Sequence, residues 1–198
     1  MRSINLAANE HPDIEQPISI IKLYNSESMT LEIKKATTDE ADQLANILAQ
    51  AAQLKVALGD DAWATRDFTL ELLREWIGED DTYTVRRDGS IVATFALTWE
   101  DAVWGEQLPI AGYIHKLAVS DSARGNGIGE KILDWASAYV AENSREFLRL
   151  DFPRQNQGLK NYYEKQGFVW VRDTKVQRPG KVYLVHLYER PAAPRPRP

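Results

Sequence analysis

The chain of 198 residues contains no cysteine. It therefore has no disulfide framework, no thiolate metal site and no cysteine nucleophile, and we expect no bound metal. No apolar run approaches the ~20 residues that a membrane-spanning helix needs, and the first twenty residues lack the apolar core of a secretory signal. The net charge of −5 argues against nucleic-acid binding. These absences favour a cytoplasmic protein whose partners are neither membranes nor nucleic acids.

The two ends of the chain differ from its middle. The overall composition, 43% hydrophobic and 27% charged, is typical of a globular protein, and the length suits one domain. We interpret residues 1–28 as an N-terminal arm, in which residues 18–24 either add a strand or stay loosely attached. Residues 191–198 read PAAPRPRP and are predicted to be a disordered tail, because proline has no backbone donor. The domain itself is expected over residues 29–190.

Hydrophobic periodicity divides this domain into strands and helices. An alternating pattern predicts strands at 31–36, at 82–99 around an Asp88-Gly89 turn, and at 110–119, 147–152, 168–173 and 181–189. A turn at Pro179-Gly180 joins the last two strands. A helical pattern predicts helices at 41–58, 69–77, 128–140 and 156–167, the first one opened by a capping box of Thr37 and Glu40. This order predicts an α/β (α+β) fold with a mixed, mainly antiparallel sheet flanked by helices.

The stretch RGNGIG, residues 124–129, lies between a predicted strand and a predicted helix. Glycine lets backbone approach a ligand closely, a helix N-terminus offers unpaired N–H groups, and Arg124 adds a positive charge. The stretch is therefore either a seat for a pyrophosphate or a turn that lets the helix pack closely. A Walker loop is excluded, because Gly129 is followed by Glu130 and Lys131. A dinucleotide-binding dehydrogenase fits less well, because the third glycine of its fingerprint would fall at Glu130.

The same stretch matches the pattern [QR]-x-x-G-x-[GA] at Arg124, Gly127 and Gly129. It resembles the acetyl-CoA signature of the GNAT superfamily of N-acetyltransferases. The preceding YIHKLAV is similar to the central strand of that family. The later LRLDFPRQNQGLKNYYEKQGFVW resembles its second conserved block, with Asn156 seven residues before Tyr163. The resemblance covers roughly residues 31–189 and implies a single domain whose central strands splay apart.

The resemblance also implies how the cosubstrate, acetyl-CoA, is held. The backbone of the central strand would bind the pantetheine arm through Leu117, Ala118 and Val119. Asn156 matches the position that hydrogen-bonds this arm, although it is also placed to cap a helix. The amides of the signature loop would hold the pyrophosphate, through Arg124, Gly125, Asn126, Gly127, Ile128 and Gly129.

For catalysis, Tyr163 matches the general acid that protonates the departing thiolate. Tyr162, next to it, is interpreted as a core residue. Many members of the family use a glutamate as general base at the position that Tyr113 holds here. His115 lies two residues on, and an imidazole exchanges protons near neutral pH. Glu100 is a second candidate base.

Asp101, next to Glu100, is a further candidate base, and either acid would act directly or through water. Trp99 and Trp104 flank these acids, and they either cradle a cationic amine or anchor the loop.

These residues predict an acetyl-CoA-dependent N-acetyltransferase that acts on a primary amine, by direct attack in a ternary complex. A small-molecule amine is the favoured substrate. The alternative is a catalytically silent CoA-binding module of the same fold. Proteins of this family often form homodimers, but the sequence does not fix the oligomeric state.

Overall fold

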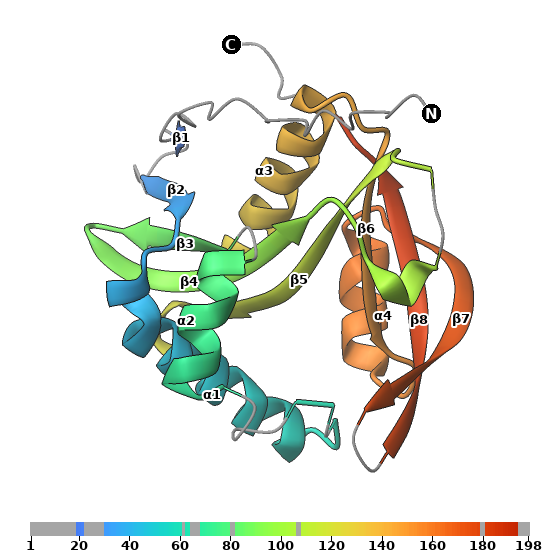
Figure 1. Cartoon of the computed structure of the whole chain (residues 1–198), viewed down its shortest axis with the longest axis horizontal. Helices are drawn as coiled ribbons and strands as arrows, with labels where there is room; N and C mark the ends of the chain where they lie inside the picture. The colour runs from blue at the N-terminus through green and yellow to red at the C-terminus, as the bar shows by residue number, and fades with distance from the viewer. Residues whose placement is uncertain are drawn as a thin grey trace, which may run out of the picture.

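A computed structural model describes residues 19–21, 30–60, 62–63, 68–79, 82–105, 108–178 and 181–193. The expected tail beyond residue 193, most of the N-terminal arm and the Pro179-Gly180 turn lie outside the described residues. The described strands form one sheet in the order β1-β2-β3-β4-β5-β6-β8-β7 (Figure 1). The α/β fold predicted from the sequence is confirmed.

The first half of the sheet is an antiparallel meander. It consists of β1 (Ser19–Ile21), β2 (Leu31–Lys35), β3 (Thr82–Arg87) and β4 (Ser90–Thr98). The predicted turn joins β3 to β4 through Asp88 and Gly89, with φ angles of 52° and 79°. Positive φ at both central residues matches the twist of a two-residue hairpin, which is why the Asp-Gly pair was a strong signal.

The two central strands separate. β5 (Ala111–Val119) and β6 (Phe147–Pro153) run parallel, but they pair only from Ala111–Tyr113 to Phe147–Arg149. Beyond these three residues β5 turns away from β6 (Figure 1). β8 (Lys181–Pro191) then continues the sheet antiparallel to β6, and β7 (Val169–Arg178) forms its outer edge. This confirms a mixed, mainly antiparallel sheet with splayed central strands.

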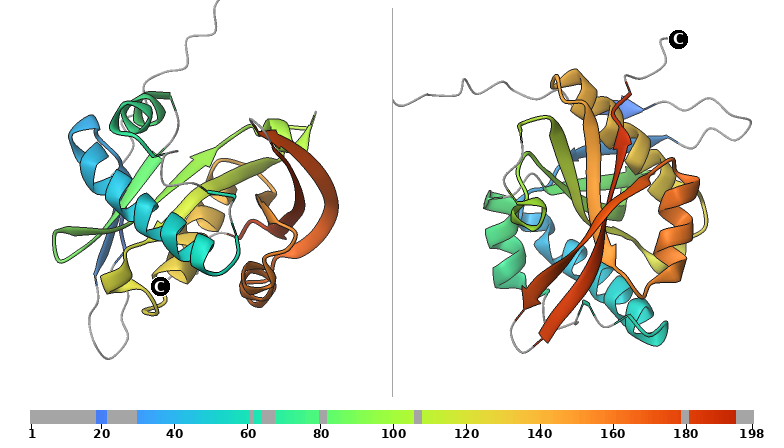
Figure 2. Two further views of the ribbon diagram at one scale, coloured as in Figure 1. Left: turned by 90° about the horizontal axis from the view of Figure 1, so that it is seen from below. Right: turned by 90° about the vertical axis from the view of Figure 1, so that its right-hand side faces the viewer.

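Helices cover both faces of the sheet. α1 (Ala41–Ala57) and α2 (Leu70–Glu79) lie over one face, and α3 (Ile128–Glu142) and α4 (Gln157–Lys165) lie over the other. The right-hand view of Figure 2 shows α2 and α4 on opposite sides of the strands. The apolar face of α3, with Ile132, Trp135 and Val140, packs onto β3 to β6 in the main core. Among the described residues, no helix is long and apolar enough to cross a membrane.

Most element boundaries fall within a few residues of the sequence predictions. β7 is the exception, because it continues to Arg178, five residues beyond the predicted Asp173. Its second half, TKVQR, is too polar to be recognised as a strand, and it pairs with β8 along a sheet edge. The ordered chain also passes the expected domain end at residue 190, since Ala192 donates a backbone hydrogen bond to Glu146 at 2.7 Å.

Candidate active site

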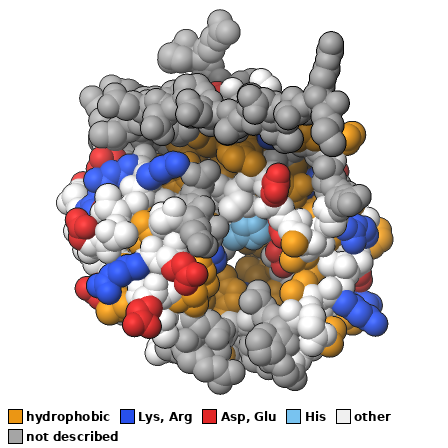
Figure 3. All heavy atoms as spheres, in the orientation of Figure 1, with side chains coloured by type: hydrophobic (Ala, Val, Ile, Leu, Met, Phe, Trp, Pro, Cys, Tyr) orange, Lys and Arg blue, Asp and Glu red, His pale blue; other side chains and the backbone are white. Residues whose placement is uncertain are grey.

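A cavity of about 810 Å³ lies where β5 and β6 separate. Its walls come from the signature loop, β5, β6, α4, the end of α1 and the segment after β4. Figure 3 shows a hollow in this face with a histidine side chain at its floor, and His115 is the histidine that lines the cavity. The splay therefore creates the space into which residues from distant parts of the chain converge.

The signature loop presents backbone amides to one end of this cavity. Gly127 is the N-cap of α3 and has a φ of 69°, which a residue with a Cβ rarely adopts. The first helical hydrogen bond runs from Lys131 to the Gly127 carbonyl at 3.2 Å. The amides of residues 128–130 precede that bond, so they are available to an anion at the positive end of the helix dipole. The loop thus has the geometry of a phosphate site.

Eight of the residues predicted to bind the cofactor line the cavity. Asn126 and Asn156 are not among the described lining residues, and the Asn126 side chain donates to the Ala123 carbonyl instead. Their roles towards the cofactor stay predictions. The eight are Leu117, Ala118, Val119, Arg124, Gly125, Gly127, Ile128 and Gly129.

Gly129 makes room for a tyrosine. A Cβ at this position would lie 2.6 Å from the hydroxyl oxygen of Tyr162, closer than real contacts allow. Burial and then the charge of Glu130 raise the pKa of Tyr162 to about 12. Tyr162 packs against the main core, as expected, but it also lines the cavity beside the loop. The packing between α3 and α4 therefore leaves room for a Cβ at residue 129 only if the Tyr162 side chain shifts.

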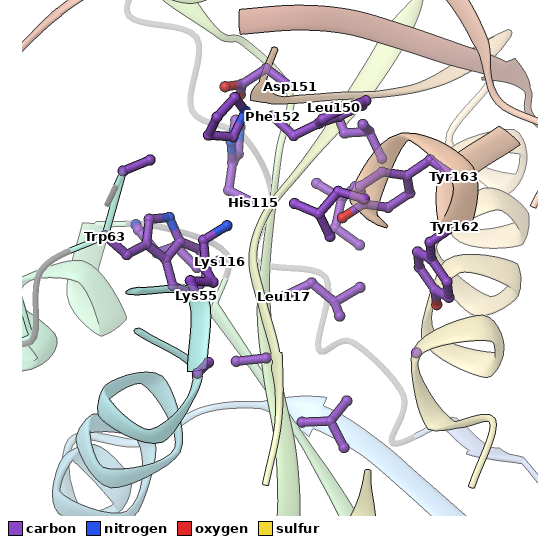
Figure 4. A pocket seen from close by; sticks show the side chains of 18 of the residues that line it. Lys55, Trp63, His115, Lys116, Leu117, Leu150, Asp151, Phe152, Tyr162 and Tyr163 are labelled. Carbon is purple, nitrogen blue, oxygen red and sulfur yellow. The ribbon is translucent and has the colours of Figure 1, made fainter. Parts of the chain in front are cut away.

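Tyr163 faces the middle of the cavity. Its ring packs against Phe152 and Phe168, with centroids 5.4 and 5.7 Å away. The hydroxyl points towards β5 (Figure 4). Burial, followed by the neighbouring Tyr162 and Asp151, raises the pKa of Tyr163 well above its ordinary value. The phenol therefore stays protonated at neutral pH, which is the state that a proton donor needs.

Tyr113, at the position of the family base, is a core residue. It is buried, its ring lies 6.0 Å from that of Trp104, and its hydroxyl accepts a hydrogen bond from Arg149 at 3.3 Å. Arg149 is in turn paired with Glu189 at 2.9 Å. Tyr113 thus belongs to the packing between β5, β6 and β8.

His115 and Asp101 lie on the floor of the cavity. The Asp101 side chain is 8% exposed, and its Oδ1 accepts a hydrogen bond from the Val103 amide at 2.9 Å. Its Oδ2 is buried, has no hydrogen-bond partner among the described residues, and lies 3.9 Å from Nε2 of His115. Asp151, from β6, completes a group whose ligand atoms all lie within 4.8 Å of one another. Two carboxylates and an imidazole at this spacing can hold a cation.

Of the two acids that precede the splayed strand, Asp101 is the one turned inwards. Glu100 lines the cavity but is exposed to solvent. Asp101 is the N-cap of the short helix at Ala102–Trp104, and this contact fixes its side chain. The structure thus brings both candidate acids to the cavity, and Asp101 is the one that faces His115.

The hypothesis of a cradle built from Trp99 and Trp104 is wrong. Neither is among the described residues that line the cavity. The guanidinium carbons of Arg145 and Arg149 lie over these rings, 5.5 and 4.5 Å from the centroids of Trp99 and Trp104. The two tryptophans anchor the loop. Trp63 lines the cavity instead, although it belongs to no motif that the sequence shows.

Asn156 caps α4 and also ties it to α1. Its Oδ1 accepts a hydrogen bond from the Leu159 amide at 2.9 Å, and its Nδ2 donates to Asp60 at 2.6 Å. Asp60 also pairs with Lys55 at 2.9 Å. Burial alone would raise the pKa of the Asp60 carboxyl, but Lys55, Asn156 and the Ala62 amide together lower it below its ordinary value. The expected capping role of Asn156 is confirmed.

Comparisons with known proteins agree with this architecture. The chain is 28% identical over 138 residues to the S-(2-succino)cysteine N-acetyltransferase of Bacillus subtilis, covering 68% of this chain and 81% of that protein. A GNAT-family acetyltransferase from Listeria monocytogenes is 18% identical, with a TM-score of 0.65 over 87% of this chain and 99% of that one.

RimL, a ribosomal L7/L12 α-N-protein acetyltransferase solved with coenzyme A, is 17% identical with a TM-score of 0.65, over 87% and 98% of the two chains. At these identities the two solved structures establish the fold. The acetyltransferase (GNAT) family matches residues 42–168, more than half of the chain. The protein therefore belongs to the acetyltransferase (GNAT) family and is an acyltransferase that uses acetyl-CoA.

Proposed function

We propose that this protein transfers the acetyl group of acetyl-CoA directly to the primary amine of a small molecule, within a ternary complex. One observation carries the proposal. A single cavity connects the signature loop and Tyr163 with His115 and Asp101. Cofactor and acceptor can therefore meet inside it without an acyl-enzyme intermediate, and the absence of cysteine removes the commonest nucleophile for one.

The splay supports a defined placement for the cofactor. The amides at the start of α3 would hold the pyrophosphate. Ala118 and Val119 pair with β4 on one side, while the pairing of β5 with β6 ends at Tyr113. Their other edge is thus available for hydrogen bonds to the amides of the pantetheine arm. An arm lying along this edge leads the thioester towards Tyr163.

The reaction then needs three proton transfers. The acceptor ammonium loses a proton to His115, and the free amine attacks the thioester carbon to form a C–N bond. The C–S bond breaks as the tetrahedral intermediate collapses, and the thiolate takes a proton from Tyr163. The new amide nitrogen gives up its surplus proton, which returns Tyr163 to its protonated form. The products are an N-acetylated amine and CoA. His115 and Tyr163 come from β5 and α4 and face the space where β5 and β6 separate (Figure 4).

Two features support a small acceptor. The polar groups opposite Tyr163 are recessed, with the side chains of Asp101 and His115 only 8% and 25% exposed. The B. subtilis relative is named for an amino-acid derivative. RimL, by contrast, is named for a protein substrate, but at 17% identity that likeness concerns the fold.

Initial-rate kinetics test the proposal. CoA release is measured over a panel of amino acids, polyamines, aminoglycosides and peptides, with both substrates varied. We expect intersecting double-reciprocal lines, as for a ternary complex. Parallel lines would contradict direct transfer. Binding of acetyl-CoA without turnover on any amine would identify a silent CoA-binding module.

A further inference from the structure

The last position of the signature pattern allows glycine or alanine, and the structure shows which atom an alanine would meet here. Gly129 lies in the first turn of α3, and a Cβ on it would be 2.6 Å from the hydroxyl oxygen of Tyr162. The next atoms, Cζ of Tyr162 and Cδ2 of Leu117, would be 3.6 and 3.9 Å away, which are ordinary van der Waals contacts. The hydroxyl of Tyr162 is thus the group that makes alanine unsuitable.

Tyr162 and Tyr163 are consecutive residues of α4, but their hydroxyls point to different parts of the cavity that both side chains line. The two rings meet edge to face, with centroids 5.2 Å apart. Figure 4 shows the hydroxyl of Tyr163 directed towards β5 and that of Tyr162 directed away from it. The close approach to Gly129 places the Tyr162 hydroxyl against the first turn of α3. The two phenols therefore serve different ends of the cavity.

Packing accounts for the ring of Tyr162 but not for its hydroxyl. The ring contacts Tyr163 and the main core. Among the described residues the hydroxyl has no hydrogen-bond partner, and it is not one of the polar atoms buried without a partner. A phenylalanine would fill the same space as the ring. The hydroxyl is therefore a hydrogen-bond donor that is open to the cavity.

The hydroxyl keeps its proton at neutral pH, because burial and then the charge of Glu130 raise the pKa of Tyr162 to about 12. A protonated phenol can donate to an anion without repelling it. The amides of residues 128–130 lie in the same turn and precede the first helical hydrogen bond. Glu130 also lines the cavity, but it is exposed to solvent, which screens its charge. The phenol thus adds a side-chain donor to a group of backbone donors.

We propose that Tyr162 binds the cofactor, its hydroxyl donating a hydrogen bond to a phosphate oxygen of the CoA pyrophosphate. The inference rests on the placement of the cofactor in the proposed function. The amides of α3 contact the phosphate from one side, and Tyr162 contacts it from the side of α4. This contact accounts for the hydroxyl, which packing does not need, and for the glycine at residue 129, which gives the hydroxyl its room. Tyr162 then acts in binding, whereas Tyr163 acts in proton transfer.

Titration calorimetry with CoA, phosphopantetheine and pantetheine tests this role. The first two carry phosphate at the end of the pantetheine arm, and the third does not. We expect Tyr162→Phe to raise the Kd of CoA and of phosphopantetheine about tenfold, because the phosphate loses a charge-assisted hydrogen bond. The Kd of pantetheine should not change. Tyr139→Phe, on α3 and not among the described residues that line the cavity, is the matched control and should bind all three as the wild type does.

Gly129→Ala tests the contact between the two residues. The introduced Cβ should lower Tm and raise the Kd of CoA, because it displaces the Tyr162 hydroxyl. In the Tyr162→Phe background the nearest atom becomes a ring carbon at 3.6 Å, so the same substitution should change neither value. Alanine is a better helix former than glycine, so a fall in Tm that needs the hydroxyl comes from this contact. The unfolding curves also verify that each variant is folded.

The outcomes separate the role of Tyr162 from the placement of the cofactor. Wild-type affinity for CoA in Tyr162→Phe would remove the residue from cofactor binding. An equal loss of affinity for pantetheine would place the contact on the arm and overturn the assignment to phosphate. Equal effects of Gly129→Ala in both backgrounds would mean that the missing Cβ makes room for the cofactor, and would overturn the pairing of the two residues. If the wild type bound CoA no more tightly than pantetheine, the proposed pyrophosphate seat would itself be wrong.

Discussion

At the scale of single residues, Tyr163 offers the most direct test of the chemistry. Tyr163→Phe keeps the ring that packs between Phe152 and Phe168 and removes only the hydroxyl. We expect kcat to fall about 100-fold, because the thiolate would leave without its proton donor. The KM for acetyl-CoA should change little, since the loop amides remain. Steady-state kinetics measure both.

Tyr139→Phe, on α3, removes a hydroxyl outside the cavity and serves as the control. Since burial raises the pKa of Tyr163, the wild-type rate should not decline through its ionisation below about pH 10. A Tyr163→Phe enzyme with wild-type kcat would remove the residue from the reaction.

His115 is the residue proposed to take the proton of the acceptor. We expect His115→Ala to lower kcat/KM about 100-fold at neutral pH, because the acceptor ammonium loses its base. The pH dependence of kcat/KM should also differ between the variant and the wild type. An unchanged pH–rate profile would mean that Asp101 or Glu100, not His115, is the base. The control is His115→Gln, which keeps a hydrogen-bonding side chain and so distinguishes the loss of the base from a loss of packing.

At the scale of elements, sequence patterns predicted the helices and strands but not their irregularities. Regular spacing identified α3 and the hairpin, because their signals are local. β5 contains a β-bulge, at which Lys116 and Leu117 both lie opposite one residue of β4. This irregularity depends on the register of β4 against β5, which a single strand sequence does not encode, so the face of the sheet on which Lys116 lies could not be predicted.

The contact between the end of α1 and the start of α4 makes a prediction of its own. Asp60→Asn replaces a buried acceptor of hydrogen bonds from Asn156, Lys55 and the Ala62 amide. Lys55 loses the negative charge with which it pairs, and the amide introduced at residue 60 would face the side-chain amide of Asn156. We therefore expect the free energy of unfolding to fall by about 2–3 kcal/mol. For a chain of this length that lowers Tm by roughly 5–10 °C. Thermal unfolding at pH 7 measures it.

The pH dependence of this effect has a definite sign. The pKa of Asp60 is lowered in the folded state, so its stabilisation is present above the unfolded pKa of about 4 and is lost as pH falls below that value. The difference in Tm between wild type and Asp60→Asn should therefore shrink below pH 4. Asp134→Asn, which removes a largely exposed partner of Arg190, should lower Tm by much less. Equal effects of the two variants would refute the Asp60 contact.

At the scale of the whole molecule, the loop that lines one end of the cavity could be recognised from sequence, and the cluster on the floor of the cavity could not. Arg124, Gly127 and Gly129 lie within one short motif, so their pattern can be recognised in the sequence alone. Asp101, His115 and Asp151 come from three separate segments, and only the splay brings them within 4.8 Å. Sequence reasoning named two of the three as candidates but assigned no acceptor-site role to Asp151, which lies within an ordinary strand pattern.

The splay also determines how the molecule should respond to its cofactor. β5 and β6 share three paired residues, so acetyl-CoA lying between them would join two parts of the sheet that hold each other weakly. At a concentration 100 times its Kd, acetyl-CoA should stabilise the fold by about 2.7 kcal/mol, a rise in Tm of roughly 5–10 °C. NAD at the same concentration should give no rise, which separates the acetyltransferase from a dinucleotide-binding enzyme.

Hydrogen exchange then shows where the stabilisation arises. If acetyl-CoA spans the splay, protection should increase both at residues 117–131, from β5 and the signature loop, and at residues 150–163, from β6 and α4. Protection confined to the signature loop would mean that the cofactor contacts only one side, and the placement of the thioester beside Tyr163 would then be wrong. The two-sided pattern is expected because the cavity that connects Tyr163 to the loop has walls from both sides of the splay.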